Sequence, residues 1–341
     1  MHSVRSGPWE EKLILNKMLN KNLFTNEQEM KATREGFGIA LRDLGDEDNK
    51  VVALCADLTE SVQMHLFKEK FASRFVEVGI TEQNMAAMAS GMAAMGTLPF
   101  IASYAMFNPG RNWEQIRTTI AYNNQKVVIV GAHAGLSVGP DGGTHQAIED
   151  IALMRVMPNM TVLSPCDARE AYMMTRLAHD IDGPVYIRLA REKSPVIFSD
   201  EYTKIDIKKP EILFVSPDVH AKKVCIFATG PIIYEALLAA RELSDKNIQV
   251  AVVNISCIKP LPDAAIVRFA SQYKNIITVE EHQRAGGMGS AVCELLAEQH
   301  PTKVIRMGID NRFGQSGTST YLYREYGISK DDIIRTCLEN I

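Results

Sequence analysis

The sequence predicts an α/β protein of two domains, each built on a mostly parallel sheet flanked by helices. Short, β-branched and almost wholly apolar segments alternate with helical patterns, first over residues 28–191 and again over 224–341. Strands that are apolar on both faces are typical of parallel sheets that are covered by helices on both sides. The length of 341 residues also fits two domains of ordinary size.

The elements of the first domain follow from this alternation. Strands are expected at residues 51–57, 75–79, 99–103, 126–132, 161–165 and 185–190, and helices at 28–44, 80–96, from 109, at 145–157 and from 167. Thr81 is a residue type that caps helices, which places Glu82 in the first turn of the helix at 80–96. Asn108 and Pro109 have the form of a helix start, with asparagine as the cap and proline at the first position.

The second domain repeats the pattern over a shorter length. Strands are expected at residues 224–229, 249–256, 275–281 and 303–309, and helices from 231, at 263–272, from 287 and from 329. Residues 192–223 contain three prolines and no helical period, so they are predicted to be a linker. Residues 1–27 lack the uninterrupted apolar run of a signal peptide, and they are predicted to form an N-terminal arm that is either flexible or a short helix.

Composition excludes several classes of protein. The net charge of −4 argues against a nucleic-acid binder that works by neutralising phosphates. The six cysteines are widely spaced without a C-x-x-C pair, which excludes a zinc ribbon and gives no support for a disulfide framework. No apolar run approaches the roughly 18 residues of a membrane span. These features predict a cytoplasmic protein with reduced thiols.

The segment GITEQNMAAMASGMAAMG, residues 79–96, places Glu82 at the start of a helix that carries a stripe of methionines. An acidic residue in the first turn complements the helix dipole, and methionines at helical spacing usually pack against a core. The segment by itself therefore has a purely structural interpretation, and a functional role for Glu82 is the alternative.

A glycine-rich loop is the second segment of interest. Five glycines fall within residues 131–143, directly after an apolar strand. Glycine lets the backbone approach a ligand closely, and ligands of open α/β sheets lie beyond the carboxyl ends of the strands. His133, Asp141 and His145 lie on this loop or at the entrance to the next helix, and these residue types suit proton transfer or hydroxyl recognition. The alternative is a simple Asp-Gly turn.

Other candidates are open to two interpretations. Tyr104 and Phe107 could pack in the core or stack on a planar ring. Arg34 and Arg191 are isolated basic residues at element ends, where solvation at the surface is the default. The glycines of GGMGSAV, residues 286–292, do not complete a dinucleotide-binding G-x-G-x-x-G and predict a tight strand-to-helix turn.

Taken together, VEVGITEQNMAAMASG, SYAMF, GLSVGPDGGTHQAIEDIALMR and VLSPCDARE resemble motifs of the transketolase family of thiamine-diphosphate enzymes. The motifs occur in the family's order, from about Ala32 to the C-terminus. The resemblance implies a pyrimidine-binding domain followed by a transketolase C-terminal domain. Deoxyxylulose-phosphate synthases are similar at the same loops. The β subunits of 2-oxo-acid dehydrogenases share the architecture, but GPDGGTHQ fits them less well.

One departure from the family shapes the functional prediction. A full transketolase begins with a diphosphate-binding domain that carries a G-D-G motif, and this sequence has none. The resemblance therefore implies the C-terminal subunit of a split transketolase. Thiamine diphosphate is expected between this subunit and a partner subunit, in an α2β2 heterotetramer with residues 80–96 near the dimer interface. Mg²⁺ or Ca²⁺ is expected to have its ligands on the partner, so no metal ligand is assigned here.

The resemblance also implies which residues face the cofactor. In the family, one glutamate hydrogen-bonds a ring nitrogen of the aminopyrimidine. Glu82 matches it and is expected to be a carboxyl that is shielded from water and shares a proton. Tyr104 and Phe107 match the aromatic pair that packs on the pyrimidine ring, and Asp57 and Leu58 match a strand-end segment beside the cofactor.

Substrate residues transfer in the same way. Asp141 resembles the aspartate that recognises a sugar hydroxyl near the reacting carbon. His145 resembles a residue at the donor's terminal hydroxyl and is expected to be catalytic together with Glu82. The cluster that grips the sugar phosphate is matched by Arg34, Ser61, His133 and Arg191. Arginine suits this task because its planar fork pairs two phosphate oxygens. In the family the C-terminal domain serves mainly in assembly, and no site residue is assigned to it.

The implied reaction is the transfer of a two-carbon ketol unit from a ketose phosphate to an aldose phosphate, as in the pentose phosphate pathway. The alternatives are a subunit like deoxyxylulose-phosphate synthase or like a 2-oxo-acid dehydrogenase β subunit, and a non-catalytic paralogue.

Overall fold

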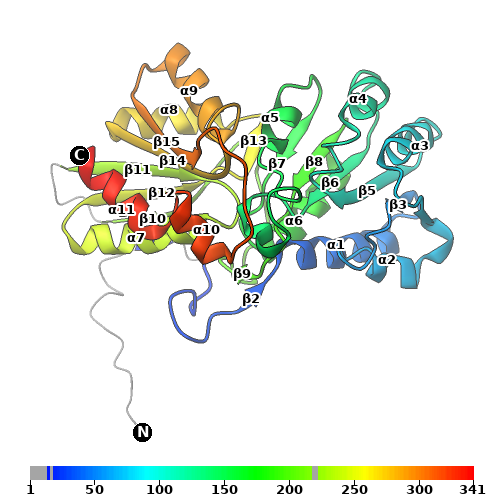
Figure 1. Ribbon diagram of the computed structural model, residues 1–341, viewed down its shortest axis with the longest axis horizontal. Helices are drawn as coiled ribbons and strands as arrows, with labels where there is room; N and C mark the ends of the chain where they lie inside the picture. Colours follow the sequence, from blue (N-terminus) through cyan, green and yellow to red (C-terminus); the bar gives the residue numbers. More distant parts are fainter. Residues whose placement is uncertain (1–13, 16–17, 217–221) are drawn as a thin grey trace, which may run out of the picture.

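The computed structural model describes residues 14–15, 18–216 and 222–341, which form two α/β domains side by side (Figure 1). The strands of the first domain are β2 (Met30–Lys31), β3 (Val51–Cys55), β4 (Phe75–Glu77), β5 (Leu98–Tyr104), β6 (Val128–Ala132), β7 (Thr161–Leu163), β8 (Val185–Arg188) and β9 (Ser194–Pro195). Its helices are α1 (Thr33–Glu47), α2 (His65–Lys70), α3 (Glu82–Ala94), α4 (Trp113–Gln115), α5 (Asp150–Arg155) and α6 (Ala168–Asp180). Single 3₁₀ or π segments cover Ala72–Arg74, Ile116–Ala121 and Leu136–Asp141.

The second domain comprises the C-terminal part of the chain and one strand from its start. Its strands are β1 (Ile14–Leu15), β10 (Glu211–Val215), β11 (Lys223–Ala228), β12 (Gln249–Asn254), β13 (Cys257–Lys259), β14 (Asn275–Gln283) and β15 (Val304–Ile309). Its helices are α7 (Ile233–Asp245), α8 (Asp263–Gln272), α9 (Met288–Gln299), α10 (Ser319–Glu325) and α11 (Lys330–Glu339). No helix in the described residues is long and apolar enough to cross a membrane.

Both sheets are mostly parallel, which confirms the predicted fold class. The first has the order β13-β7-β8-β6-β5-β3-β4, and only β13 runs antiparallel to its neighbour. The second has the order β1-β10-β12-β11-β14-β15, in which β10 runs antiparallel to both of its neighbours, β1 and β12, and the remaining pairs are parallel. The carboxyl ends of the parallel strands in the first sheet therefore meet at one edge, where ligands of such sheets bind.

Helices cover both faces of the first sheet, as the apolar strands require. Alternate residues of β3 show the division: Ala53 packs in the cluster with Phe37 of α1, whereas Leu54 packs in the cluster with Met85 of α3. Successive side chains of a strand point to opposite faces, so a strand buried on both faces is apolar throughout.

The two domains share one continuous junction. Strand β13 leaves the second domain and pairs with β7, so the second half of the chain adds an edge strand to the first sheet. A buried ion pair lies nearby, where Arg188 Nε donates to Asp150 Oδ2 at 2.9 Å. Arg188 also donates to the backbone oxygen of Glu281 on β14 at 2.8 Å. This ion pair is thereby tied to both domains.

Three predicted helix starts, at residues 28, 109 and 145, are wrong because contacts with distant parts of the chain hold the first residues outside the helix. Residues 30–31 pair as β2 with β9, so the first helix begins at Thr33 and not at 28. The helix predicted from Pro109 begins at Trp113, because the buried Asn108 amide donates to the Val130 oxygen at 3.1 Å instead of capping.

The helix predicted at 145–157 begins only at Asp150. The preceding residues stay with the glycine-rich loop, since Ala147 bridges Ala134 and Gln146 donates to the Leu136 oxygen. Thr81 precedes α3 as predicted, but its hydroxyl donates to the Val78 oxygen at 2.7 Å and does not cap the helix.

The predicted linker and arm contain ordered strands. Within residues 192–223, β9 pairs with β2 and β10 belongs to the second sheet. Of the predicted arm 1–27, the described part includes β1, which pairs with β10, and Leu19 and Leu23, which are buried in the core of the second domain. The remainder of the arm lies outside the described residues.

The turn predicted at residues 286–292 is present between β14 and α9. The buried Glu280 carboxylate accepts the backbone N–H groups of Met288 and Gly289 at 2.7 and 2.8 Å. The amino end of α9, which a dinucleotide would need for its phosphates, is thus filled by the chain's own carboxylate.

Candidate active site

The predicted site residues gather at the carboxyl edge of the first sheet. Strands β3, β5, β6 and β8 are parallel neighbours, and each is followed by predicted residues. The segment after β3 carries Asp57, Leu58 and Ser61, and the end of β5 with the residues after it carries Tyr104 and Phe107. The segment after β6 carries His133, Asp141 and His145, and the one after β8 carries Arg191. Segments far apart in the sequence thus converge on one edge (Figure 1).

Four aromatic rings pack into one cluster. The Tyr104 ring lies 3.8 Å from the His133 ring and 6.1 Å from the Phe107 ring, and both pairs are stacked. The His145 ring meets Tyr104 and Phe107 edge-on, at 6.2 and 5.9 Å. The chain therefore presents a ready-made aromatic wall with a histidine at its rim, a surface suited to a planar ring.

His133 is a neutral imidazole inside this cluster. Its side chain is buried, and burial lowers its pKa to about 3, with further lowering by the positive charges of Arg34 and Arg191 and by His145. Its Nδ1 atom is buried without a hydrogen-bond partner among the described residues. A neutral ring with an uncommitted nitrogen can hydrogen-bond a ligand that reaches it.

Arg34 and Arg191 form a positively charged cradle beside His133. Arg34 Nη1 donates to the Ser61 backbone oxygen at 2.6 Å, so Ser61 contributes its carbonyl to this contact. Burial lowers the pKa of Arg34, and the charge of Arg191 lowers it further. Two guanidinium groups that repel each other beside a neutral histidine form a site that an anion would stabilise.

Asp141 lies within reach of this cradle. Its Oδ1 atom is 3.9 Å from Arg191 Nη2, and Arg191 also donates to the Val138 oxygen at 3.0 Å. The Nδ1 atom of His145 lies 2.9 Å from the Thr144 hydroxyl oxygen, within hydrogen-bond distance. Asp141 ends the 3₁₀ segment of the glycine-rich loop and His145 follows it before α5 begins, so the loop's shape decides their positions.

Glu82 is buried at the start of α3, with 2% of its side chain exposed. Its Oε2 atom accepts a hydrogen bond from Arg111 Nη1 at 3.0 Å, an ion pair that the sequence did not indicate. Asn112 donates to the Glu82 backbone oxygen at 3.1 Å and to Asn108 Oδ1 at 3.0 Å, which fixes the first turn of α3 against the strand ends.

The segment with Asp57 and Leu58 is held by a carboxylate that sequence reasoning missed. Glu77 accepts the backbone N–H of Asp57 at 2.7 Å, the Thr59 hydroxyl at 2.8 Å and the backbone N–H of Gly79 at 3.1 Å. Asp57 has a positive φ of 58° and is exposed just beyond the end of β3. Glu77 thus joins the end of β3 to the turn that leads into α3.

The C-terminal domain holds the glycine-rich loop, although no site residue was predicted there. Gln146 of the loop donates to the Gln315 oxygen at 3.0 Å. A Cβ at Gly143 would lie 2.6 Å from the Gly314 oxygen, so only glycine permits this approach. Residues 314–317 therefore pack directly against the loop.

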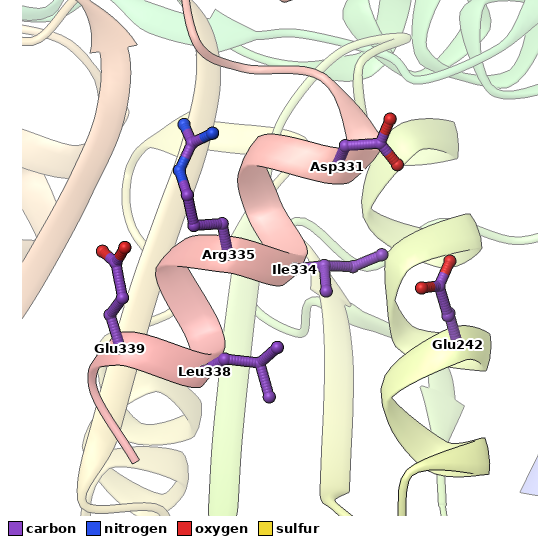
Figure 2. Close-up of a pocket in the computed structure, with 6 residues that line it drawn as sticks. All are labelled: Glu242, Asp331, Ile334, Arg335, Leu338 and Glu339. Carbon is purple, nitrogen blue, oxygen red and sulfur yellow. The ribbon is translucent and has the colours of Figure 1, made fainter.

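Other features of the surface lie away from this edge. A hollow of 440 Å³ between α7 and α11 is lined by Glu242, Asp331, Ile334, Arg335, Leu338 and Glu339. Figure 2 shows Ile334 and Leu338 on the side of α11 that faces α7. None of the predicted site residues lines it. Among the residues that the structure covers, no group of three or more histidine, cysteine or acidic side chains is placed to hold a metal ion.

Comparison with known proteins identifies both domains of the chain. Residues 29–196 match the family model of the transketolase pyrimidine-binding domain, and residues 215–333 match that of the transketolase C-terminal domain. A putative transketolase C-terminal section from Methanocaldococcus jannaschii is 38% identical over 313 residues, which are 91% of this chain and 96% of the relative.

Two further relatives extend the comparison. A 6-deoxy-6-sulfo-D-fructose transketolase subunit from a Clostridium species is 36% identical, over 90% of this chain and 93% of the relative. A solved split-gene transketolase, described as an inactive β4 tetramer, is 37% identical with a TM-score of 0.80, over 91% of this chain and 97% of that chain.

The fold and the matched domains define a chain of the thiamine-diphosphate-dependent class, with a pyrimidine-binding domain followed by a smaller α/β domain. The chain belongs to the transketolase family and carries the two domains of a split transketolase's C-terminal subunit.

Proposed function

We propose that this chain supplies the pyrimidine-binding half of a thiamine diphosphate site in a split transketolase that transfers a two-carbon ketol unit between sugar phosphates. One observation carries the proposal: buried Glu82, the aromatic wall of Tyr104 and Phe107, and the cradle of Arg34 and Arg191 lie along one sheet edge. These are the three functions that such a reaction needs, namely a proton-sharing carboxyl, a surface for a planar ring and an anion site.

The residues fit the cofactor's pyrimidine ring. The Glu82 carboxyl is shielded from water and can share a proton with a ring nitrogen, while Phe107 and Tyr104 offer their faces to the ring. When bound, thiamine diphosphate supplies the nucleophilic carbon that attacks the ketose carbonyl. The protein orients the pyrimidine ring and shields the Glu82 carboxyl from water.

The remaining residues hold the sugar. Neutral His133, with its free Nδ1 atom, can hydrogen-bond a substrate hydroxyl, and His145 at the rim of the wall can hold or move a proton at the donor's terminal hydroxyl. Asp141 accepts from a hydroxyl near the reacting carbon. Arg34 and Arg191 bind the phosphate group at the end of the sugar. One relative is named for a sulfonated sugar, whose negatively charged end would also need a cationic site.

The proposal includes a partner subunit. The diphosphate and its Mg²⁺ or Ca²⁺ are assigned to a chain that carries G-D-G, in an α2β2 assembly. The relative described as an inactive β4 tetramer supports this, since that protein is inactive in the form that was solved.

The test is reconstitution with a G-D-G-containing subunit. The pair should transfer a ketol unit from a ketose phosphate to an aldose phosphate when thiamine diphosphate and Mg²⁺ are present, and should not decarboxylate pyruvate. Pyruvate decarboxylation without ketol transfer would assign the chain to a related reaction. Failure of both assays in a pair that binds the cofactor would favour a non-catalytic paralogue.

A further inference from the structure

Arg111 contacts two of the residues that the proposed function assigns to the pyrimidine ring. Its guanidinium donates to Glu82 Oε2 at 3.0 Å, and its Cζ atom lies 5.2 Å from the centre of the Phe107 ring. Glu82 and Phe107 are two of the groups assigned to the pyrimidine, so the guanidinium lies against both at once. A ring that packs on Phe107 and hydrogen-bonds Glu82 competes directly with this side chain.

The two partners of the ion pair differ in their freedom to move. Glu82 is 2% exposed, and its backbone oxygen is held by Asn112 at 3.1 Å. Arg111 is 49% exposed on a long side chain, so it can turn into solvent at a modest cost. When a ligand enters, the arginine is therefore the partner that leaves.

We propose that Arg111 is a positioning residue that closes the pyrimidine site in the cofactor-free subunit and must release Glu82 before thiamine diphosphate binds. This inference rests on the proposed function. The ion pair keeps a buried carboxylate partnered while the site is empty, since an unpaired buried charge is costly. It also makes cofactor binding weaker than the pocket alone would allow, because part of the binding energy is spent on breaking the pair.

The strength of the effect follows from the exposure of Arg111. Ion pairs with a solvent-accessible partner are weak, so removing the guanidinium should tighten cofactor binding by about three- to tenfold. Arg111→Met keeps an unbranched side chain but removes the guanidinium and its charge. Arg111→Lys keeps a cation that can still pair with Glu82. Arg117→Met is the matched control, because Arg117 is also exposed and lies only six positions further along, in the π segment Ile116–Ala121.

The experiment is titration of thiamine diphosphate, with Mg²⁺ in excess, into the reconstituted pair, followed by calorimetry and by the association rate in stopped flow. Arg111→Met should lower the Kd and raise the association rate, whereas Arg111→Lys and Arg117→Met should behave like the natural protein. An unchanged or higher Kd in Arg111→Met would overturn the inference and leave the proposed function intact. Absence of cofactor binding by the natural pair would remove the proposed function and this inference with it.

Discussion

Glu281, on β14 of the C-terminal domain, accepts the backbone N–H of Ser137 in the glycine-rich loop at 2.8 Å. Its other carboxylate oxygen accepts the Tyr323 hydroxyl at 2.8 Å. The loop that carries His133, Asp141 and His145 is thus fixed by a buried side chain of the other domain. The C-terminal domain therefore shapes the candidate site, a role that goes beyond assembly.

Glu281→Gln should loosen this contact. The amide can accept from only one of the two donors in the same geometry, so we expect about 1–3 kcal/mol of lost unfolding free energy. The ketol-transfer assay should show a higher KM for the sugar donor, because the loop residues that hold it are displaced. Glu298→Gln, an exposed residue of α9, is the control. Kinetic constants equal to those of the control would show that the contact does not position the loop.

Gly143→Ala tests the close approach of residues 314–317. The new methyl group would lie 2.6 Å from the Gly314 oxygen, a distance that requires one backbone segment to move. We expect roughly 1–3 kcal/mol of destabilisation and weaker substrate binding.

Gly91→Ala in α3 is the matched variant, since its methyl group would meet nothing within 4 Å. That change should stabilise the helix by about 0.5–1 kcal/mol in thermal unfolding of the isolated chain. Equal effects of the two substitutions would contradict the described packing.

Glu82→Gln tests the proton-sharing carboxyl. The amide has nearly the same shape but cannot exchange a proton with a ring nitrogen, so kcat of the reconstituted pair should fall by at least about 100-fold. Circular dichroism should show an intact fold, because the substitution leaves the backbone contacts of Asn112 in place. Glu69→Gln, exposed on α2, should be fully active. Full activity of Glu82→Gln would rule out the proposed role.

The fold could be predicted from the sequence because it depends on local patterns. Apolar runs such as 128–132 and 249–254 are buried on both faces, and they appear as such in the sequence. The wrong helix starts arose where tertiary contacts override local preference. Asn108 has the residue type of a cap, yet its amide donates to backbone oxygens in the middle of two buried strands, those of Ile101 in β5 and Val130 in β6.

The site could be predicted only in part. The family motifs predicted the candidate residues, but not the contacts that support them, because each contact joins segments that are distant in the sequence. Glu281 meets Ser137 across 144 positions, and Arg111 meets Glu82 across 29. Neither pair follows a local spacing rule, so only the folded chain shows them.

His133 should make stability depend on pH. Its folded-state pKa of about 3 lies below the ordinary value of 6.5, chiefly because burial disfavours the charged ring. Between these values the unfolded chain binds the proton, so this contribution to stability is complete above pH 6.5 and is lost as the pH falls toward 3. The expected slope is about 1.4 kcal/mol per pH unit. Urea unfolding of His133→Asn at pH 5 and pH 7 should lack this slope, whereas His300→Asn should retain it. Identical pH dependence in both variants would contradict the prediction.

Glu170 should show the opposite sign. It is a buried residue of α6 that faces β12. Its carboxylate accepts hydrogen bonds from the Cys166 backbone N–H at 2.7 Å and from the Asn254 side-chain amide at 2.9 Å. Burial raises its pKa from 4.5 to about 7, and that of its neighbour Asp167 to about 6. The folded state therefore holds protons that the unfolded state releases, so the contribution of Glu170 to the unfolding free energy is complete below pH 4.5 and is lost as the pH rises to 7.

Glu170→Gln cannot ionise. The unfolding free energy of the natural protein relative to this variant should fall as the pH is raised from 4.5 to 7, by about 1.4 kcal/mol per unit at most. A constant difference across that range would show that Glu170 is ionised throughout, held by its two donors.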